Sequence, residues 1–524
     1  MPAPTLADAA LAARTAAEAA GLPFAATPPA LPPADLLAVL PMPFARRHLV
    51  LPLARDADGV QVALADPSAL APLDDLRFLY GAPVRPVVVP PPVLRDAITR
   101  AYDAAARSAA DTMEAIEGER LELVASELEE PPDLLEAGDE APVIRLLNAL
   151  LSQAVKDGAS DIHLEPYERD VAVRFRVDGV LGDVLAAPAR MHPALASRVK
   201  IMAGLDIAER RLPQDGRIAV RVAGRDVDIR VSLVPTAFGE RVVLRLLDRS
   251  AALRDLADLG LAPARAAALE RLAGQSHGIL LVTGPTGSGK TTTLYAVLRR
   301  LATGERNIMT IEDPVEYRLR GIGQIQVNPR IDLGFATGLR AVLRQDPDVI
   351  LVGEIRDRET VEIAMQAALT GHLVFSTLHT TDACGAMTRL LDMGVEPFLI
   401  SSSIVGVLAQ RLVRRLCDVC ASTGPPTPAE RDALGEPVPP TVRHAGPGCA
   451  ACRGTGYRGR VGIHELLVVD DGVRALVMAR RDAAALRRRA AASGTTSLRD
   501  DGFAKVRAGV TTVAEVLRAT QDDA

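Results

Sequence analysis

The residues with the most specific chemistry in this chain form one glycine-rich segment. Its eight members are Gly284, Pro285, Thr286, Gly287, Ser288, Gly289, Lys290 and Thr291. In such a loop, backbone N–H groups surround a nucleotide phosphate, the lysine reaches the β- and γ-phosphates, and the last hydroxyl ligates Mg²⁺. An apolar strand pattern at 279–282 precedes it and a helical pattern begins at Thr292. This setting predicts an ATP site that these eight residues and Thr292 contact, and it disfavours a chance glycine turn.

Carboxylates follow the next apolar strand pattern, at residues 308–311. They are Glu312, Asp313 and Glu316. Ligands of a parallel sheet collect at the carboxyl ends of its strands, so these groups are expected near a nucleotide. One of them could act as a general base or orient the water that attacks the γ-phosphate. The alternative is a solvated acidic turn that Pro314 ends.

A single acid, Glu354, follows a third apolar pattern at 349–352. It suits the carboxylate that holds Mg²⁺ together with Thr291. Gly353 stands where many such enzymes carry Asp, so Glu354 must serve alone, unless it only caps the strand. His372 and His379 bracket a fourth pattern. They could sense the γ-phosphate, or they could be hydrogen-bonded structural histidines.

Arginines are a further requirement, because a fixed guanidinium stabilises the charge that phosphoryl transfer spreads over the γ-oxygens. The candidates are Arg230, Arg245, Arg340, Arg344 and Arg356. A neighbouring domain or subunit can supply such a group. For any one of these residues the alternative interpretation is a surface salt bridge.

Four of the five cysteines form two C-x-x-C pairs. They are Cys417 with Cys420, and Cys449 with Cys452. In a reducing cytoplasm this pattern indicates metal ligation before disulfides. Four thiolates make a closed tetrahedral structural Zn²⁺ site, and free or redox-active thiols are the alternative. Cys384 stands alone and is predicted to be a buried small residue.

The elements that must position these groups follow from the pattern of apolar residues. Short continuous apolar runs at 278–283, 308–311, 349–352 and 373–376 alternate with helical patterns, which is typical of parallel strands buried on both faces. Ahead of them, helical spacing over 143–154 and alternation over 173–177 and 217–232 predict an α+β domain. Asp178-Gly179 and Gly224 are its turn signals.

The chain is therefore expected to have seven segments. They are a flexible or weakly helical leader (1–30), a small N-terminal α/β domain (31–103), an acidic linker (104–140), the α+β domain (141–250), the ATPase domain (251–415), the cysteine module (416–465) and a C-terminal helical region (466–524).

Composition limits the classes of function. The 524 residues carry a net charge of −6 and only 3% aromatics. A general nucleic-acid binder usually carries a basic surplus, so direct nucleic-acid binding is disfavoured. The chain shows no signal peptide pattern and no apolar stretch of the roughly 20 residues that a bilayer requires. We expect a cytoplasmic protein whose contact with a membrane is indirect, through a partner.

These motifs, in this order, resemble the secretion superfamily ATPases over about residues 31–520. Four boxes carry the resemblance, at 284–291, 310–316, 349–354 and 371–379. The stretches at 159–166, 211–217 and 239–247 add to it. The chain is most similar to the type II secretion ATPase family, the E proteins of the general secretion pathway.

The resemblance implies a RecA-like ATPase domain, a PAS-like domain before it, and a homo-hexameric ring peripheral to the inner membrane. It implies that Glu316 acts on the attacking water and that Glu354 is the Walker B glutamate. The other residues implied at the nucleotide are Lys290, Arg230, Arg245, Arg340, Arg344 and His379. ATP, Mg²⁺ and Zn²⁺ are the implied cofactors. The implied partners are the cytoplasmic domain of the type II secretion protein L, docked by the N-terminal domain, and the platform protein F.

The function that follows is a motor that hydrolyses ATP to drive pseudopilus assembly and protein export. Its near rival is the type IV pilus assembly ATPase, which shares every box. A nucleic-acid motor is disfavoured by the acidic net charge. A non-hydrolysing nucleotide switch is disfavoured because Lys290, Thr291, Glu316 and Glu354 are all intact.

Overall fold

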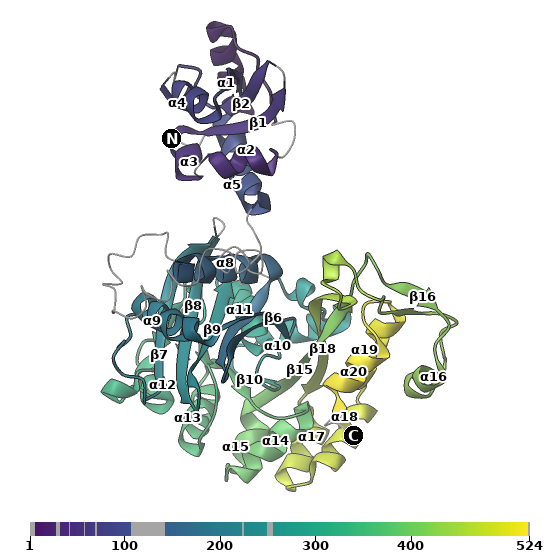
Figure 1. Ribbon diagram of the computed structural model, residues 1–524. Coiled ribbons are helices and arrows are strands. Elements are labelled where there is room, and N and C mark those ends of the chain that lie inside the picture. Colours follow the sequence, from purple (N-terminus) through teal and green to yellow (C-terminus); the bar gives the residue numbers. More distant parts are fainter. Residues whose placement is uncertain are drawn as a thin grey trace. The chain divides into compact units, whose positions relative to one another are not determined.

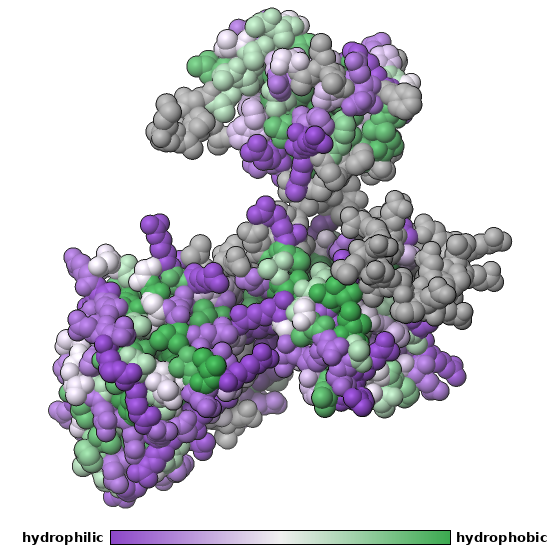
Figure 2. Space-filling model, turned by 90° about the vertical axis from the view of Figure 1, so that its left-hand side faces the viewer, coloured by the Kyte–Doolittle hydropathy of each residue, from purple (hydrophilic) through white to green (hydrophobic). Residues whose placement is uncertain are grey.

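The computed structural model describes most of the chain. The described residues are 6–27, 32–40, 42–56, 58–68, 71–105, 142–222, 225–248 and 255–521. The chain divides into two compact units, Met1–Leu247 and Asp248–Ala524. Nearly all of the predicted acidic linker lies outside the described residues. Within them, no helix has both the length and the apolar character needed to cross a membrane. On the face in Figure 2, hydrophobic residues form separate patches between hydrophilic ones.

The first unit begins with an α/β fold around a three-stranded sheet (Figure 1). Its strands are β1 (Val50–Asp56), β2 (Gly59–Leu64) and β3 (Val84–Val88). Strands β1 and β2 pair antiparallel, whereas β3 pairs parallel to β2. The accompanying helices are α1 (Leu6–Ala20), α2 (Ala34–Val39), α3 (Met42–His48), α4 (Ala71–Tyr80) and α5 (Pro91–Ala105).

Helix α1 lies within the stretch 1–30 that was predicted to be a flexible or weakly helical leader, and it is packed. Its Ala13 and Ala17 are buried in one cluster with Val88 of β3, and Phe24 forms a β-bridge with the same valine. Alanine has the highest helix propensity, and its small side chain lets a helix approach its neighbour closely. A stretch that lacks large apolar residues is therefore a packed helix here.

The rest of the first unit is an α+β fold, as predicted. A six-stranded sheet has the order β6-β5-β4-β9-β8-β7. The strands are β4 (Ala159–Pro166), β5 (Asp170–Val177), β6 (Val180–Pro188), β7 (Gln214–Val222), β8 (Arg225–Thr236) and β9 (Gly239–Asp248). The helices α8 (Pro142–Asp157) and α9 (His192–Ala203) pack on it. Asp178 and Gly179 have φ of 50° and 85°, as a type I′ hairpin requires. The turn predicted at Gly224 lies outside the described residues.

The second unit is built on a seven-stranded sheet with the order β12-β11-β13-β14-β10-β15-β18. The first six strands pair parallel, and β18 is antiparallel to β15. The strands are β10 (Gly278–Thr283), β11 (Ile308–Glu312), β12 (Gly323–Gln326), β13 (Val349–Val352), β14 (Leu373–Leu378), β15 (Ile404–Leu416) and β18 (Tyr457–Val468). The four predicted strands are β10, β11, β13 and β14.

Both faces of this sheet are buried, which explains why its strands are apolar throughout. Ile279 and Leu281 of β10 belong to a core shared with α12 (Phe335–Val342), α13 (Arg358–Leu369) and α14 (Ala383–Asp392). Leu280 and Val282 belong to a second core, shared with α10 (Pro263–Ala273) and α11 (Lys290–Leu301). Successive residues of a strand point to opposite faces, so both sets must be apolar.

The cysteine module is an insertion between β15 and β18. Its short elements are β16 (Ser422–Gly424), α16 (Pro428–Leu434), β17 (Val442–His444) and the 3₁₀ turn η5 (Ala450–Cys452). The expected boundary at residue 465 falls inside β18, because that strand leaves the module and joins the ATPase sheet. The helices that follow are α17 (Asp471–Met478), α18 (Ala483–Ala492), α19 (Leu498–Arg507) and α20 (Val513–Ala519). Helix α19 packs on β18, and α20 packs on β15.

Three 3₁₀ turns and one short helix complete the described elements. They are η1 (Ala189–Met191), η3 (Leu256–Leu259), η4 (Pro329–Ile331) and α15 (Pro397–Ser403).

Candidate functional site

The glycine-rich segment forms the loop between β10 and α11. Gly284, Gly287 and Gly289 have φ of 151°, 79° and 89°, which side chains disfavour. A Cβ at Gly284 would lie 2.4 Å from the carbonyl oxygen of Gln410 and 2.6 Å from Ser288 Oγ. Ser288 Oγ is buried, and within the described part of the chain it has no hydrogen-bond partner. An unpaired hydroxyl in a glycine loop at a helix N-terminus fits a bound phosphate.

Lys290 opens helix α11 and its ammonium group folds over the loop. Nζ donates to the carbonyl oxygens of Gly284 at 2.7 Å and Pro285 at 3.0 Å. Desolvation by burial lowers the pKa of Lys290 to about 8, while Glu354 raises it and Arg411 lowers it further. Both carbonyl bonds can be exchanged for bonds to phosphate oxygens, which are stronger acceptors because they are charged.

Glu354 follows β13 and lies at the same edge of the sheet. Its side chain is 16% exposed and lies 2.5 Å from Arg356 Nη2 and 3.4 Å from His379 Nε2. Because β10, β14 and β13 are parallel neighbours, their carboxyl ends lie side by side. The fold therefore brings Lys290, Glu354 and His379 together, as a nucleotide site requires.

Two residues that the sequence associated with this site have structural roles. A Cβ at Gly353 would lie 3.3 Å from Glu312 Cα and 3.3 Å from the carbonyl oxygen of Ile311. Crowding between β11 and β13 accounts for the glycine at a position where Asp is common. His372 lies before β14, at the opposite end of that strand, with Nδ1 2.8 Å from the carbonyl oxygen of Ala367. Its contacts fit the structural alternative.

The carboxylates after β11 differ in their surroundings. Glu312 is 4% exposed, and its Oε2 accepts a short hydrogen bond from the hydroxyl of Tyr295 on α11. Its Oε1 accepts from Thr310 Oγ1 at 2.5 Å and from Gln324 Nε2 at 3.2 Å. Glu316 is half-buried in the following loop. Glu312 is thus an anchor of the fold, and Glu316 stays the candidate for the attacking water.

Arg340 and Arg344 are not brought to the phosphate-binding loop of their own chain. Arg340 pairs at 2.5 Å with Glu359 in the first turn of α13. Arg344 donates to the carbonyl oxygen of Arg340. The next residue, Gln345, accepts from Asn307, which precedes β11 at the end opposite the acidic loop. Their approach to a nucleotide, whether in their own chain or in another subunit, stays a prediction.

Arg230 and Arg245 lie in the six-stranded sheet of the first unit. Arg245 Nε donates to the buried carboxylate of Asp161 at 3.0 Å. Arg230 of β8 stands opposite Arg217 of β7. Their approach to a nucleotide stays a prediction.

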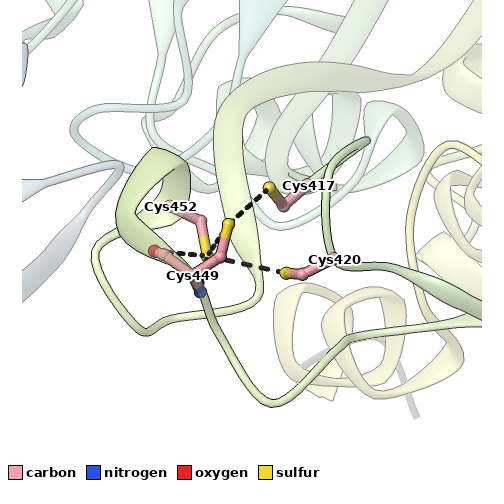
Figure 3. A group of neighbouring side chains, drawn as sticks. All are labelled: Cys417, Cys420, Cys449 and Cys452. Carbon is pink, nitrogen blue, oxygen red and sulfur yellow. Dashed lines mark hydrogen bonds between the residues drawn. The ribbon is translucent and has the colours of Figure 1, made fainter.

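The four predicted metal ligands converge (Figure 3). Their sulfur atoms all lie within 4.8 Å of one another. Cys417 and Cys449 are 3.8 Å apart, and Cys452 is 3.7 Å from both Cys420 and Cys449. A tetrahedral ion with metal–sulfur bonds of about 2.3 Å would place its ligands about 3.8 Å apart. The thiols therefore fit a tetrahedral metal ion. Cys384 is separate and 1% exposed, which confirms that it is a buried small residue.

Backbone groups around the cluster favour thiolates. The N–H groups of Cys449 and Gly456 each donate to Cys452 Sγ at 3.2 Å. Although desolvation raises the pKa of the Cys452 thiol, these bonds, together with those from Cys420 and Cys449, lower it overall, whereas burial raises the pKa of Cys420. N–H groups that donate to a ligating sulfur orient that ligand and tune the affinity of the site for its metal.

Comparison with known proteins decides the family. A family model described as "Type II/IV secretion system protein" matches residues 136–518, and one described as "MshEN domain" matches residues 20–108. This chain belongs to the type II/IV secretion system protein family. The second match begins at Ala20, the last residue of α1.

Two relatives in the secretion family are similar to this chain over most of their own length. The chain is 49% identical over 487 residues to the type II secretion system ATPase E of Vibrio cholerae, covering 92% of this chain and 97% of that protein. It is 46% identical over 496 residues to the type IV pilus assembly ATPase PilB of Myxococcus xanthus, covering 93% and 87%. The ATPase DotB of Legionella pneumophila shares the fold, with a TM-score of 0.54 and 22% identity, over 72% of this chain and 95% of that structure.

Three residues that the sequence did not single out hold the secretion ATPase site together. Thr283 Oγ1, at the end of β10, accepts from the backbone N–H of Thr380 at 2.9 Å. Gln410 Oε1 of β15 accepts from Thr293 Oγ1 at 2.7 Å. Tyr295 joins α11 to the acidic loop. Each could have been found in the sequence as a polar residue within an otherwise apolar strand or helix face.

Proposed function

We propose that this chain is the ATPase of a type II secretion system. In this function a homo-hexamer hydrolyses ATP to ADP and phosphate and drives pseudopilus assembly and protein export, a translocase-type activity. The observation that carries the proposal is the convergence of Lys290, Glu354 and His379 at one edge of the sheet. The similarity to a type II secretion ATPase over 97% of its length supports it.

The residues at this edge divide the work of phosphoryl transfer. Lys290 binds the β- and γ-phosphate oxygens after it releases its two carbonyl partners. Thr291 and Glu354 offer the oxygen ligands that Mg²⁺ prefers, and Mg²⁺ when bound neutralises charge on the phosphates. Glu316 orients the attacking water and accepts its proton. His379, beside Glu354, is placed to sense the γ-phosphate.

Arginines complete the charge stabilisation in this scheme. Arg230 and Arg245 come from the α+β fold, and Arg340 and Arg344 come from a neighbouring subunit of the ring. A guanidinium supplied in trans would make hydrolysis depend on assembly.

The Cys₄ cluster and the N-terminal fold have proposed roles in stability and in attachment to the membrane machinery. We propose that Zn²⁺ fills the Cys₄ cluster as a structural ion, since its sulfur spacing fits that metal. The N-terminal α/β fold docks onto the cytoplasmic domain of the type II secretion protein L, and the ring acts on the platform protein F. The protein is then cytoplasmic and peripheral to the inner membrane.

The test is the ATPase rate of the full chain with and without the cytoplasmic domain of protein L. We expect stimulation by this partner and loss of hydrolysis in Glu316→Gln, with about one Zn²⁺ per chain as a single Cys₄ site requires. An enforced hexamer that hydrolyses no ATP would refute the motor and leave a nucleotide-binding scaffold.

The second candidate is a type IV pilus assembly ATPase. The 46% identity to PilB over 93% of this chain favours it as the rival. The same assay separates the two functions. Hydrolysis that ignores protein L but responds to a pilus platform protein would move the assignment to pilus assembly.

A further inference from the structure

The hydroxyl of Tyr295 joins the phosphate-binding helix to the acidic loop. Tyr295 lies on α11, which begins with Lys290, and is 2% exposed. Its hydroxyl donates to Glu312 Oε2 and accepts from the backbone N–H of Glu316 at 3.3 Å. Its ring meets the ring of Tyr317 edge to face, with 6.1 Å between centroids. One buried side chain thus contacts the end of β11 and the loop that follows it.

The carboxylate that receives this hydroxyl is itself fixed. Glu312 Oε1 accepts from Thr310 Oγ1 at 2.5 Å and from Gln324 Nε2 at 3.2 Å. The amide of Gln324 also holds the middle of the loop, since it donates to the carbonyl oxygen of Tyr317 at 2.9 Å and accepts from the N–H of Leu319 at 2.7 Å. The network therefore ties the acidic loop to both β11 and β12.

The direction of each hydrogen bond follows from the protonation of the phenol. Burial, together with the charge of Glu312, raises the pKa of Tyr295 well above its usual range. The hydroxyl keeps its one hydrogen and donates it to Glu312. A lone pair is left for the N–H of Glu316. Phenylalanine would preserve the ring packing and remove both bonds.

We propose that Tyr295 is a positioning residue for ATP hydrolysis, whose hydroxyl holds Glu316 at a fixed place relative to Lys290 and Thr291. The inference rests on the proposed function, in which Glu316 acts on the attacking water. The helix that places the phosphate ligands also places the carboxylate that must face them. A displacement of about 1 Å at such a group can slow a reaction about 100-fold.

The first variant is Tyr295→Phe in the full-length, assembled protein. We expect kcat to fall at least about tenfold, with the KM for ATP within about twofold of the wild type, because binding groups are untouched while the hydrolytic group is displaced. Tyr457→Phe is the matched control. It removes a hydroxyl that lies 3.0 Å from Thr512 Oγ1 in the same unit, and we expect it to leave kcat unchanged.

A second variant guards against a folding defect. Glu312→Gln keeps the shape of the anchor and weakens its acceptors, and we expect kcat to fall in the same way. Melting temperature and affinity for a non-hydrolysable ATP analogue show whether each variant is folded. A folded variant with normal affinity and slow turnover separates positioning from mere stability.

The double variant Tyr295→Phe/Glu316→Gln distinguishes the inference from the function on which it rests. We expect it to be no slower than Glu316→Gln alone, since both changes act through one carboxylate. If Glu316→Gln is inactive but Tyr295→Phe turns over as fast as Tyr457→Phe, the positioning role is refuted and the motor stands. If Glu316→Gln is as active as the wild type, the role of Glu316 in the proposed function is refuted, and the positioning role of Tyr295 is refuted too.

Discussion

The ammonium group of Lys290 is half-buried, and the charges of the Glu354 carboxylate and the Arg411 guanidinium both act on it. Glu354 raises the pKa of its ammonium group, Arg411 lowers it, and burial lowers it most, to about 8. A bound phosphate adds negative charge next to the lysine, which raises that pKa again. Nucleotide binding and protonation of Lys290 are therefore linked.

The linkage predicts how ATP affinity depends on pH. Below about pH 8 Lys290 is already charged, and above it the free protein must take up a proton to bind. We expect the affinity for a non-hydrolysable ATP analogue to be about tenfold weaker at about pH 9.5 than at about pH 7. An unperturbed lysine would show this loss only well above pH 10.5, its ordinary pKa.

Lys290→Arg is the control for this titration, because a guanidinium stays charged throughout the range. Its affinity, measured by equilibrium binding, is expected to be flat between the same two pH values. A wild-type affinity that is equally flat would contradict the lowered pKa of Lys290.

Single residues were predictable where one continuous segment carries the chemistry. The phosphate-binding loop was found because its glycines, Lys290 and Thr291 are neighbours in sequence. Gln410, by contrast, accepts a hydrogen bond from Thr293, which is 117 residues away in the chain. Tyr295 acts through Glu312, the last residue of β11, and through Glu316 in the loop that follows. Such roles arise only when the sheet brings its strand ends together.

The long strand pair β15–β18 gives the cysteine cluster its place in the fold. Cys417 directly follows β15, and Cys452 lies just before β18. The N–H of Cys417 also donates to the carbonyl oxygen of Gly456 at 3.0 Å. A metal ion held by the four thiolates would clamp the ends of the two strands and close the insertion between them.

Removal of one ligand is expected to release the metal. Cys449→Ser should lower bound Zn²⁺ from about one per chain to near zero and lower the melting temperature, because three remaining thiolates no longer close a tetrahedral site. Metal content after dialysis and a thermal melt are the measurements. Cys384→Ala is the matched control and should retain its Zn²⁺, since burial raises the pKa of Cys384 to about 12 and the residue lies outside the cluster. Full retention of the metal in Cys449→Ser would contradict a Cys₄ site.

Strands were easiest to predict where both of their faces are buried, because their sequences are then apolar throughout. Strands β10, β11, β13 and β14 lie inside the sheet and are nearly continuously apolar. Strands β15 and β18 were missed because arginines interrupt their outer halves, at Arg411 and Arg414 in one and at Arg458 and Arg460 in the other. Arg458 and Arg460 are exposed, whereas Arg411 is buried. Helix α1 was predicted only as part of a flexible or weakly helical leader, because its packed face consists of alanines.

At the scale of the whole molecule, we propose that one chain does not complete the site by itself. Glu359 engages Arg340, and Arg344 lies near the end of β11 that is remote from the phosphate-binding loop. In this proposal the two arginines act on the nucleotide of a neighbouring subunit, where Lys290, Glu354 and Glu316 hold it. Heterologous contacts in a ring repeat one interface around the axis, so each subunit can present its arginines to the next.

Mixed rings test whether Arg344 acts on a neighbour. Lys290→Ala removes the phosphate ligand of a subunit, and Arg344→Ala removes the group that it presents. In an equal mixture, one interface in four joins an intact loop to an intact arginine, so we expect about a quarter of the wild-type ATPase rate from two inactive parents. An equal mixture of Lys290→Ala with wild type controls for subunit exchange and should give about half. If Arg344 serves the site of its own chain, no interface is repaired, and the first mixture stays as inactive as its parents while the control recovers.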